Sequence, residues 1–249
     1  MIDFARAALR HYGLADATLT LLTDANNTVY RVDAGAARYM LRLHRPGRKP
    51  LAWIEAELVW LTALNNETAL HVPQPAGRLY ATSAGIAMLF TWREGEPLTP
   101  AAFTPQHAHA LGGFAAALHT HGATIKLPDG MARPRLDWEG LFGAQSPYQP
   151  DADGDALITL SQRALMTAAA AKIKATFDAL DALPDAFGLI HADLIPKNLL
   201  WTPDGQIAAL DFDDCAVGYG LYDLAPVLWF MQSEPQYVAV REALWAAYT

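Results

Sequence analysis

The pattern of apolar and polar positions predicts a β-rich N-terminal part. Residues 3–11 have the spacing of a short helix. Three alternating runs then predict antiparallel strands, at residues 19–22, 28–32 and 38–43. Gly35 supplies a tight turn between the last two of these strands. A continuous apolar run at residues 86–91 has the length of a buried strand and stops shortly before a Gly/Pro turn. Together these runs predict a small antiparallel sheet.

A helix is predicted at residues 52–64, between the third strand and the buried strand. Its apolar stripe has helical spacing and consists of Ile54, Leu58, Leu61 and Leu64. At about 100° per residue, Glu57 falls at roughly 300° from Ile54, inside the stripe, whereas Glu55 falls at roughly 100°, outside it. A carboxylate on an apolar face needs a partner, and Arg42 on the preceding strand is the obvious one. The pattern favours an Arg42–Glu57 pair over an exposed strand arginine with no role.

The C-terminal part is predicted to be mainly helical. Thr104 and Pro105 open a helix with an N-cap residue and a proline at its first position, and this helix runs to about Thr120. A second long helix carries apolar residues on one side, at Met166, Ala169, Ile173, Phe177 and Leu180. A last helix is predicted at residues 234–248. The fold class is therefore α+β, with an antiparallel sheet followed by a mainly helical region.

Length and charge narrow the class of protein. A chain of 249 residues with 52% apolar residues suits one large domain or two small lobes. The net charge of −8 argues against a nucleic-acid binder and disfavours an anionic membrane surface. The single cysteine, Cys215, rules out an intrachain disulfide framework and fits a reducing compartment. Because no leader-like or membrane-length apolar run is present, we expect a cytoplasmic protein.

The candidate chemistry lies near residue 200. A short apolar strand at residues 187–190 leads into a polar loop with Asp193, and Asn198 follows five residues later. Two strands are predicted around the turn Thr202-Pro203-Asp204-Gly205, at residues 198–201 and 206–212. A hairpin of this kind would bring Asp211 back beside Asn198. The alternative is a polar loop before an ordinary strand that ends in acidic residues.

This set of side chains suits phosphoryl transfer. One carboxylate, Asp193, could orient an attacking hydroxyl group and accept its proton. An amide oxygen from Asn198 and a second carboxylate from Asp211 could hold the Mg²⁺ that bridges the phosphates. The loop has the pattern His-x-Asp-x-x-x-x-Asn at residues 191–198. The second aspartate, Asp211, at the end of the returning strand favours the functional interpretation of this pattern.

The segment "LIHADLIPKNLLW…LDFDDC…GYGLYDLA" resembles the aminoglycoside phosphotransferase/choline kinase-like family of the protein-kinase-like superfamily. It is most similar to the branch with type II homoserine kinases and bacterial stress-response kinases. The resemblance implies ATP, Mg²⁺ and a two-lobed fold, with an N-lobe at 1–92 and a C-lobe at 93–249. It implies that Asp193 is the catalytic base, Asn198 a metal ligand and Asp211 the principal metal ligand. His191 matches a histidine that braces the loop, and Asp223 matches an aspartate that anchors it; both are structural roles.

The resemblance also implies a nucleotide site in the N-terminal part. Asn27 matches an asparagine of the nucleotide-positioning loop, although an ordinary hairpin turn explains it equally well. Arg42 aligns with the cation that meets the α- and β-phosphates, and Glu57 with its helix glutamate. Most kinases have lysine at the position of Arg42. Arginine stays charged and can bind phosphate through two nitrogens, but it is bulkier.

The inter-lobe hinge is predicted where the buried strand ends. Adenine would hydrogen-bond to backbone groups near Thr91, Trp92 and Arg93, with Phe90 beside it. A plain strand-to-helix turn is the alternative. Asp213 is a candidate for a supporting role at the metal site or for binding a substrate amine; otherwise it caps the next loop.

The acceptor is predicted to be a hydroxyl group of a small molecule, such as an amino alcohol, homoserine-like compound, aminoglycoside or sugar. Residues 131–160 lie where relatives build part of the substrate pocket. Family members continue with further helices, so we expect C-terminal helices to be missing here, which puts full activity in doubt. A stress-response Ser/Thr protein kinase and a non-catalytic nucleotide-binding regulatory module are the two alternatives. The sequence does not indicate an oligomeric state.

Overall fold

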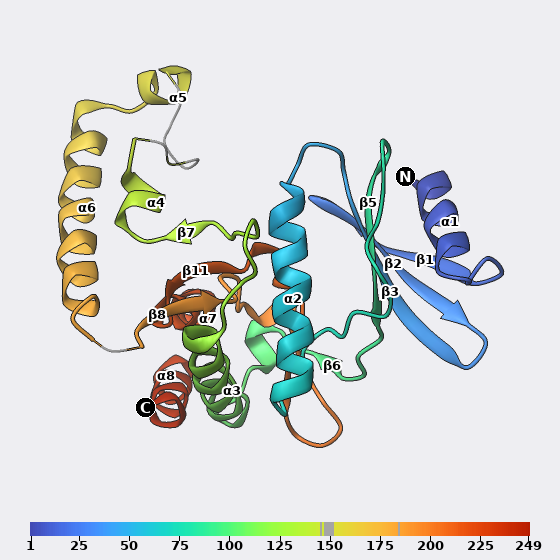
Figure 1. Ribbon diagram of the computed structural model, residues 1–249. Helices are drawn as coiled ribbons and strands as arrows, with labels where there is room; N and C mark the ends of the chain where they lie inside the picture. Colours follow the sequence, from blue (N-terminus) through green and yellow to red (C-terminus); the bar gives the residue numbers. More distant parts are fainter. Residues whose placement is uncertain (145, 147–151, 184) are drawn as a thin grey trace. The chain divides into compact units, whose positions relative to one another are not determined.

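The computed structural model describes residues 1–144, 146, 152–183 and 185–249 (Figure 1). Its internal contacts divide the chain into two compact units, which are described separately. Unit 1 comprises Met1–Ala102, Leu127–Ala132 and Pro196–Asp213, and unit 2 comprises Phe103–Lys126, Arg133–Ile195 and Asp214–Thr249. No helix among the described residues combines the length and the apolar character needed to cross a membrane.

Unit 1 is built on a five-stranded antiparallel sheet with the strand order β1-β2-β3-β5-β4. The strands are β1 (Thr18–Asp24), β2 (Asn27–Ala34), β3 (Ala37–His44), β4 (Tyr80–Thr82) and β5 (Gly85–Thr91). The four predicted strands are confirmed. The short edge strand β4 was missed, because three residues are too few to show an alternating pattern.

Helices cover both faces of this sheet, and the alternation of strand side chains assigns each face. Helix α1 (Ile2–His11) packs its apolar side against Leu41 and Leu43 of β3. Because successive side chains point to opposite faces, Arg42 lies on the other face, where it meets α2 (Leu51–Glu67). Figure 1 shows α1 and α2 on opposite sides of the strands. A sheet covered on both faces explains why residues 41–44 are all buried.

A second, three-stranded sheet in unit 1 carries the predicted hairpin. Its order is β10-β9-β6, with β6 (Glu96–Pro97), β9 (Leu199–Trp201) and β10 (Ile207–Ala209). Two predicted boundaries were wrong. Asn198 belongs to a 3₁₀ turn, Pro196–Asn198, and the returning strand ends at Ala209 rather than at Phe212. Strand geometry stops there because Asp211 has φ 58°, in the left-handed region, and a 3₁₀ turn follows at Phe212–Asp214.

Unit 2 is mainly helical around a small sheet. The sheet has the order β7-β11-β8, formed by β7 (Arg135–Leu136), β8 (Phe187–Ile190) and β11 (Ala216–Tyr219). The helices are α3 (Pro105–Thr124), α4 (Trp138–Phe142), α5 (Ala152–Ala156), α6 (Leu160–Leu180), α7 (Leu221–Met231) and α8 (Tyr237–Tyr248). Helices α3 and α8 lie side by side (Figure 1). Their backbones meet at Gly112, where an added Cβ would lie 2.3 Å from the carbonyl oxygen of Leu244.

The predicted long helix α6 forms, but none of its described side chains is buried. Met166 and Ile173 of its apolar stripe are 53% and 36% exposed. The helix meets the sheet of unit 2 through Phe177, whose ring stacks on Tyr219 with 4.7 Å between centroids. Helical periodicity therefore predicted the element correctly, although this apolar stripe is only partly covered.

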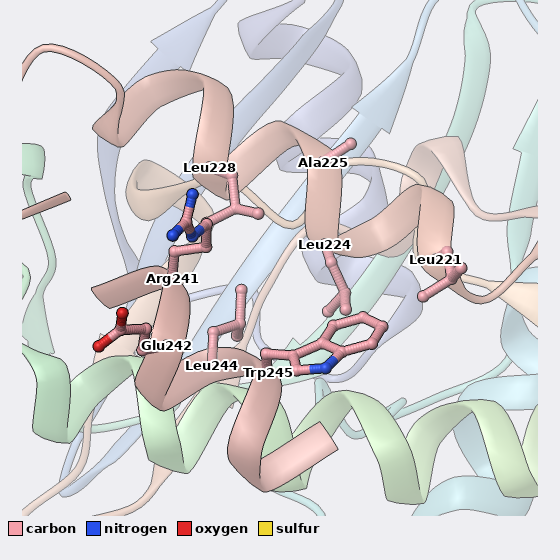
Figure 2. Close-up of a pocket in the computed structure, with 8 residues that line it drawn as sticks. All are labelled: Leu221, Leu224, Ala225, Leu228, Arg241, Glu242, Leu244 and Trp245. Carbon is pink, nitrogen blue, oxygen red and sulfur yellow. The ribbon is translucent and has the colours of Figure 1, made fainter. Parts of the chain in front are cut away.

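A cavity of about 530 Å³ lies between α7 and α8 (Figure 2). Its lining is Leu221, Leu224, Ala225, Leu228, Arg241, Glu242, Leu244 and Trp245. In Figure 2 the side chains of Leu224, Leu244 and Trp245 point toward one another between the two helices. None of the residues predicted for phosphoryl transfer lines this apolar cavity, so it is not the candidate active site.

Candidate active site

Arg42 and Glu57 form a buried ion pair in unit 1. The guanidinium group of Arg42 donates to the Glu57 carboxylate, and the two side chains are 3% and 1% exposed. Burial by itself would lower the pKa of Arg42, but the carboxylates of Glu57, Asp213 and Asp211 raise it above its usual value. The arginine therefore stays charged. This is the pair that helical periodicity predicted from the inward position of Glu57.

Arg42 also contacts the aspartate at the end of the hairpin. Its other terminal nitrogen donates to Asp211 Oδ1 at 3.1 Å. Unlike Glu57, the side chain of Asp211 is 53% exposed. One guanidinium group therefore links a buried carboxylate, which fixes its position, to an exposed carboxylate that can still receive a ligand.

Asn198 and Asp211 come together as the hairpin prediction requires. The backbone N–H of Leu210 donates to the carbonyl oxygen of Asn198 at 2.8 Å, so Asp211 follows directly after this contact. An amide oxygen and an exposed carboxylate are oxygen donors of the kind that Mg²⁺ prefers. The residues present at the end of the hairpin therefore fit a magnesium ion.

Asp213 lies at the opposite end of the same turn and is buried. Its carboxylate accepts hydrogen bonds from Asn27 Nδ2 at 2.8 Å and from Lys49 Nζ at 2.6 Å. Burial by itself would raise the pKa of Asp213, but the positive charges of Arg42, Lys49 and His44 hold it well below the usual range. The carboxylate therefore stays ionised inside unit 1. Its supporting role was one of the predicted options, but neither Lys49 nor His44 was identified from the sequence.

Three buried side chains in this region approach the spacing of metal ligands. Ligand atoms of His44, Glu57 and Asp213 lie within 4.8 Å of one another. Arg42 donates to Glu57, and Lys49 donates to Asp213. A divalent cation among these three residues would face two fixed positive charges, so we do not assign a metal to them.

The predicted catalytic base, Asp193, belongs to unit 2 and follows β8. Its side chain is half-buried, and its backbone N–H donates to Nδ1 of His191 at 3.2 Å. The carbonyl oxygen of Asp193 accepts from the backbone N–H of Ile195 at 2.9 Å. Ala192, between His191 and Asp193, has φ 67°. The loop is therefore a tight, hydrogen-bonded turn that leaves the Asp193 carboxylate partly accessible.

Asp223 holds this loop from within unit 2. Its two carboxylate oxygens accept from the backbone N–H groups of His191, at 2.7 Å, and Ala192, at 2.6 Å. His119 Nε2 lies 3.0 Å from the same carboxylate, and His119 Nδ1 lies 3.0 Å from the hydroxyl of Tyr248. Asp223 and His191 are completely buried. This network corresponds to the anchoring role that the sequence predicted for Asp223.

The residues predicted for the hinge lie at the end of β5. Phe90 is buried, with its ring centroid 5.2 Å from the Arg42 guanidinium carbon. The backbone N–H groups of Thr91 and Trp92 already donate within unit 1, to Gln74 at 2.9 Å and Arg38 at 3.1 Å.

The Arg93 side chain turns toward the end of α2. It donates to the carbonyl oxygen of Val72 at 2.8 Å and to Asn65 Oδ1 at 3.0 Å, and burial lowers its pKa. Phe90 therefore packs against Arg42, and the side chain of Arg93 is already engaged within unit 1.

The predicted acceptor segment is engaged in structural contacts where it is described. Arg133 is buried and donates to the carbonyl oxygen of Cys215. Arg135 pairs with Asp137, which also caps α4, and Trp138 stacks on Phe142. Residues 145 and 147–151 of this segment lie outside the described part of the chain. The described contacts do not single out a substrate ligand within residues 131–160.

Comparison with known proteins gives a consistent picture. The structure of a microcompartment-associated aminopropanol kinase matches with a TM-score of 0.82 and 30% identity, over 100% of this chain and 80% of that chain. An amicoumacin kinase in complex with AMP-PNP and Ca²⁺ matches with a TM-score of 0.74 and 21% identity, over 92% and 71%. The predicted α+β kinase-like fold is therefore confirmed.

The family is identified by a family model, and a sequence relative is consistent with it. A homoserine kinase from Gluconacetobacter diazotrophicus is 29% identical over 258 residues, which cover 98% of this chain and 75% of the relative. The model of the phosphotransferase enzyme family matches residues 18–249. The predicted resemblance and the predicted class of enzyme, an ATP-dependent kinase with an alcohol acceptor, are thus confirmed, and the chain belongs to the phosphotransferase enzyme family.

Proposed function

We propose that this protein transfers the γ-phosphate of Mg·ATP to the hydroxyl group of a small amino alcohol. The observation that carries the proposal is the position of Arg42, between the buried Glu57 and the exposed Asp211. A fixed cation beside an exposed carboxylate is suited to phosphates that arrive with a magnesium ion. The names of two similar proteins, an aminopropanol kinase and a homoserine kinase, support the acceptor class. Both compounds carry an amine and a hydroxyl on a short carbon chain.

The nucleotide would be held by residues of unit 1. Arg42 would neutralise the α- and β-phosphates, and Glu57 would fix the guanidinium group in place. Asn198 and Asp211 would hold Mg²⁺, which neutralises phosphate charge when it is bound. Asn27 would position the nucleotide loop. The charges of Arg42 and Asp211, and the 53% exposure of the Asp211 side chain, support these roles.

The base would be recognised by backbone groups after β5. Because Thr91 and Trp92 already use their N–H groups, the N–H of Arg93 is the best candidate donor to adenine. Among the described residues, no hydrogen-bond acceptor is found for the backbone N–H of Arg93. Phe90 would contribute indirectly, because its ring packs against the guanidinium group of Arg42. Within the predicted division at residue 92, this segment would be the hinge between the lobes.

Asp193 would orient the acceptor hydroxyl and accept its proton. The network around Asp223 supports this role, because it fixes the backbone directly before Asp193 while the carboxylate stays partly accessible. A base that is already positioned loses little entropy when the acceptor binds. Most of the rate enhancement would then come from positioning and electrostatics rather than from covalent catalysis.

The test is turnover of ATP with Mg²⁺ in the presence of 1-aminopropan-2-ol, homoserine, choline, an aminoglycoside and a sugar. Asp211→Ala should reduce acceptor-stimulated turnover by at least about 100-fold, because it removes the exposed metal ligand. Asp214→Ala removes another exposed aspartate from the same turn and should act like the wild type.

The outcomes separate the acceptor classes. Stimulation by 1-aminopropan-2-ol or homoserine above the aminoglycoside and the sugar would support the proposal. Phosphate incorporation into protein in a lysate, with no response to any small acceptor, would contradict the acceptor class and favour a protein kinase. Failure of the wild type to bind Mg·ATP in calorimetry would contradict phosphotransfer itself.

A further inference from the structure

The turn that carries Asp211 has a second aspartate with a different environment. The Asp211 side chain is 53% exposed, whereas the Asp213 side chain is 7% exposed. The two residues are separated only by Phe212, whose ring packs edge-on against Trp60 of α2 with 5.5 Å between centroids. One end of the turn is therefore available to a ligand, and the other end is anchored inside unit 1.

Lys49 contacts Asp213 at two points. Its Nζ lies 2.6 Å from Asp213 Oδ2 and 2.7 Å from the backbone carbonyl oxygen of the same residue. Contacts to both the side chain and the backbone define the orientation of the turn as well as its location. Lys49 lies in the loop between β3 and α2, far from the turn in sequence.

Asp213 also ties the turn to the predicted nucleotide loop. Asn27, the first residue of β2, donates to the same oxygen, Oδ2, at 2.8 Å. His44 Nδ1, at the end of β3, lies 3.7 Å from the other carboxylate oxygen. A single buried carboxylate thus connects three segments of unit 1 to the turn with Asp211.

A buried carboxylate in this position depends on a cation. Removing an ionised carboxylate from water is strongly unfavourable unless it is paired and hydrogen-bonded. Arg42 contributes positive charge nearby, but it makes hydrogen bonds to Glu57 and Asp211. Lys49 donates to Asp213 at 2.6 Å, closer than His44 Nδ1 at 3.7 Å, so the burial of Asp213, and with it the position of the turn, rests mainly on Lys49.

We propose that Lys49 is a positioning residue for phosphotransfer, because it holds Asp213 and thereby fixes Asp211 for the metal and Asn27 for the nucleotide. This inference rests on the function proposed above. It assigns Asp213 to the support of the turn rather than to the metal, since Oδ2 already accepts from Lys49 and Asn27. Arg42 and Asp211 touch the phosphates and the metal in this scheme, and Lys49 acts only through Asp213.

The test compares Lys49→Met with Arg48→Met in purified protein. Arg48 is exposed and precedes Lys49 in the same loop, so it controls for loss of one positive charge. We expect Lys49→Met to bind Mg·ATP about tenfold more weakly in calorimetry and to need about tenfold more free Mg²⁺ for half-maximal turnover. Arg48→Met should match the wild type, and Lys49→Arg should retain most of the wild-type affinity.

A second variant separates positioning from folding. Lys49→Met/Asp213→Asn removes both members of this ion pair, so no carboxylate is left buried without its lysine, and its melting temperature should lie closer to that of the wild type than the melting temperature of Lys49→Met does. The concentration of free Mg²⁺ that it needs for half-maximal turnover should stay raised, because the contacts of Lys49 with Asp213 are still missing. This variant provides the test even where Lys49→Met alone does not fold.

Three results would overturn the inference. Lys49→Met could match Arg48→Met in Mg·ATP affinity and Mg²⁺ requirement. Lys49→Met could lower the melting temperature with no change in the Mg²⁺ requirement, which would make Lys49 merely structural. The double variant could behave like the wild type throughout. A wild type that does not bind Mg·ATP contradicts instead the proposed function and, with it, the basis of this inference.

Discussion

Two short segments carry the predicted chemistry, and each is held by a different kind of interaction. The loop before Asp193 in unit 2 is held through its backbone, by two N–H groups that donate to Asp223. The turn after Asp211 in unit 1 is held through side-chain charges, by Arg42 and Lys49. Both segments contain a non-glycine residue with positive φ, 67° at Ala192 and 58° at Asp211. In both cases a sparsely populated backbone conformation is retained because buried partners fix it.

The difference concerns how each segment depends on its partners. A backbone N–H is present whatever the side chain, so the Asp193 loop depends mainly on one acceptor, Asp223. The Asp211 turn depends on charges that come from distant positions. Arg42 contacts both Glu57 and Asp211, and Asp213 has both Lys49 and His44 beside it. We therefore expect loss of Asp223 to be severe, and loss of a single charge in unit 1 to be partly compensated by the remaining ones.

The largest effect is expected for Asp223→Ala. This change removes the acceptor for two buried N–H groups and the partner of His119. We expect the free energy of unfolding to fall by about 3–5 kcal/mol, as measured by urea denaturation. The control is Asp178→Ala, which breaks the exposed pair with Lys174 on α6 and should cost no more than about 0.5 kcal/mol. Equal losses in the two variants would show that Asp223 does not anchor the loop.

The backbone-held loop is also the part of the site that the sequence predicts best. Asp193, His191 and Asp223 belong to short motifs with fixed spacing, and their contacts follow from the resemblance. Glu57 was predicted as well, because a single glutamate on an apolar helix stripe has few alternatives. Local pattern is sufficient wherever neighbours in sequence, or along one helix face, determine the contact.

The charge-held turn was predicted less completely, for a physical reason. Lys49 lies in a polar loop with Arg45, Pro46, Gly47 and Arg48, a composition typical of exposed segments. Nothing in that loop indicates which cation will reach a carboxylate 164 positions away. The end of the returning strand was also placed too late, because Asp211 leaves strand geometry to enter the left-handed region. Such contacts depend on how the chain folds back on itself, which local pattern does not encode.

The compensation expected in unit 1 can be tested with Glu57→Gln. Glutamine keeps one oxygen acceptor for Arg42 but removes the charge, and Asp211 and Asp213 still offset the guanidinium group. We expect a loss of about 2 kcal/mol in urea denaturation, smaller than for Asp223→Ala. Glu55 on the same helix is half-buried and lies outside the predicted stripe. Glu55→Gln should therefore cost less than about 0.5 kcal/mol. A loss for Glu57→Gln as large as that for Asp223→Ala would contradict the idea that charges in unit 1 compensate one another.

A hydrogen bond between uncharged groups in unit 1 provides a reference for the stability losses expected of Asp223→Ala and Glu57→Gln. The hydroxyl of Tyr12 donates to the carbonyl oxygen of Ala87 at 2.9 Å, which links the end of α1 to β5. Tyr12→Phe removes this bond together with the one that the hydroxyl accepts from the backbone of Tyr80, without changing any charge, and should cost about 1 kcal/mol at pH 8 in urea denaturation. A cost well below that of Glu57→Gln would show that charge, rather than hydrogen bonding alone, accounts for the larger effect.

The same tyrosine predicts a change with pH that has a definite sign. Burial raises the pKa of Tyr12 to about 12, and a hydrogen bond from the backbone of Tyr80 opposes this shift. Because the folded-state pKa lies above the usual value of about 10, the neutral phenol contributes its stability fully below pH 10. That contribution is lost as the pH rises from 10 toward 12, so the wild type should lose its advantage over Tyr12→Phe in this range. Tyr219, which also has a raised pKa, is present in both proteins and cancels in the difference. A stability difference that stays constant from pH 9 to pH 12 would mean that Tyr12 is not buried as described.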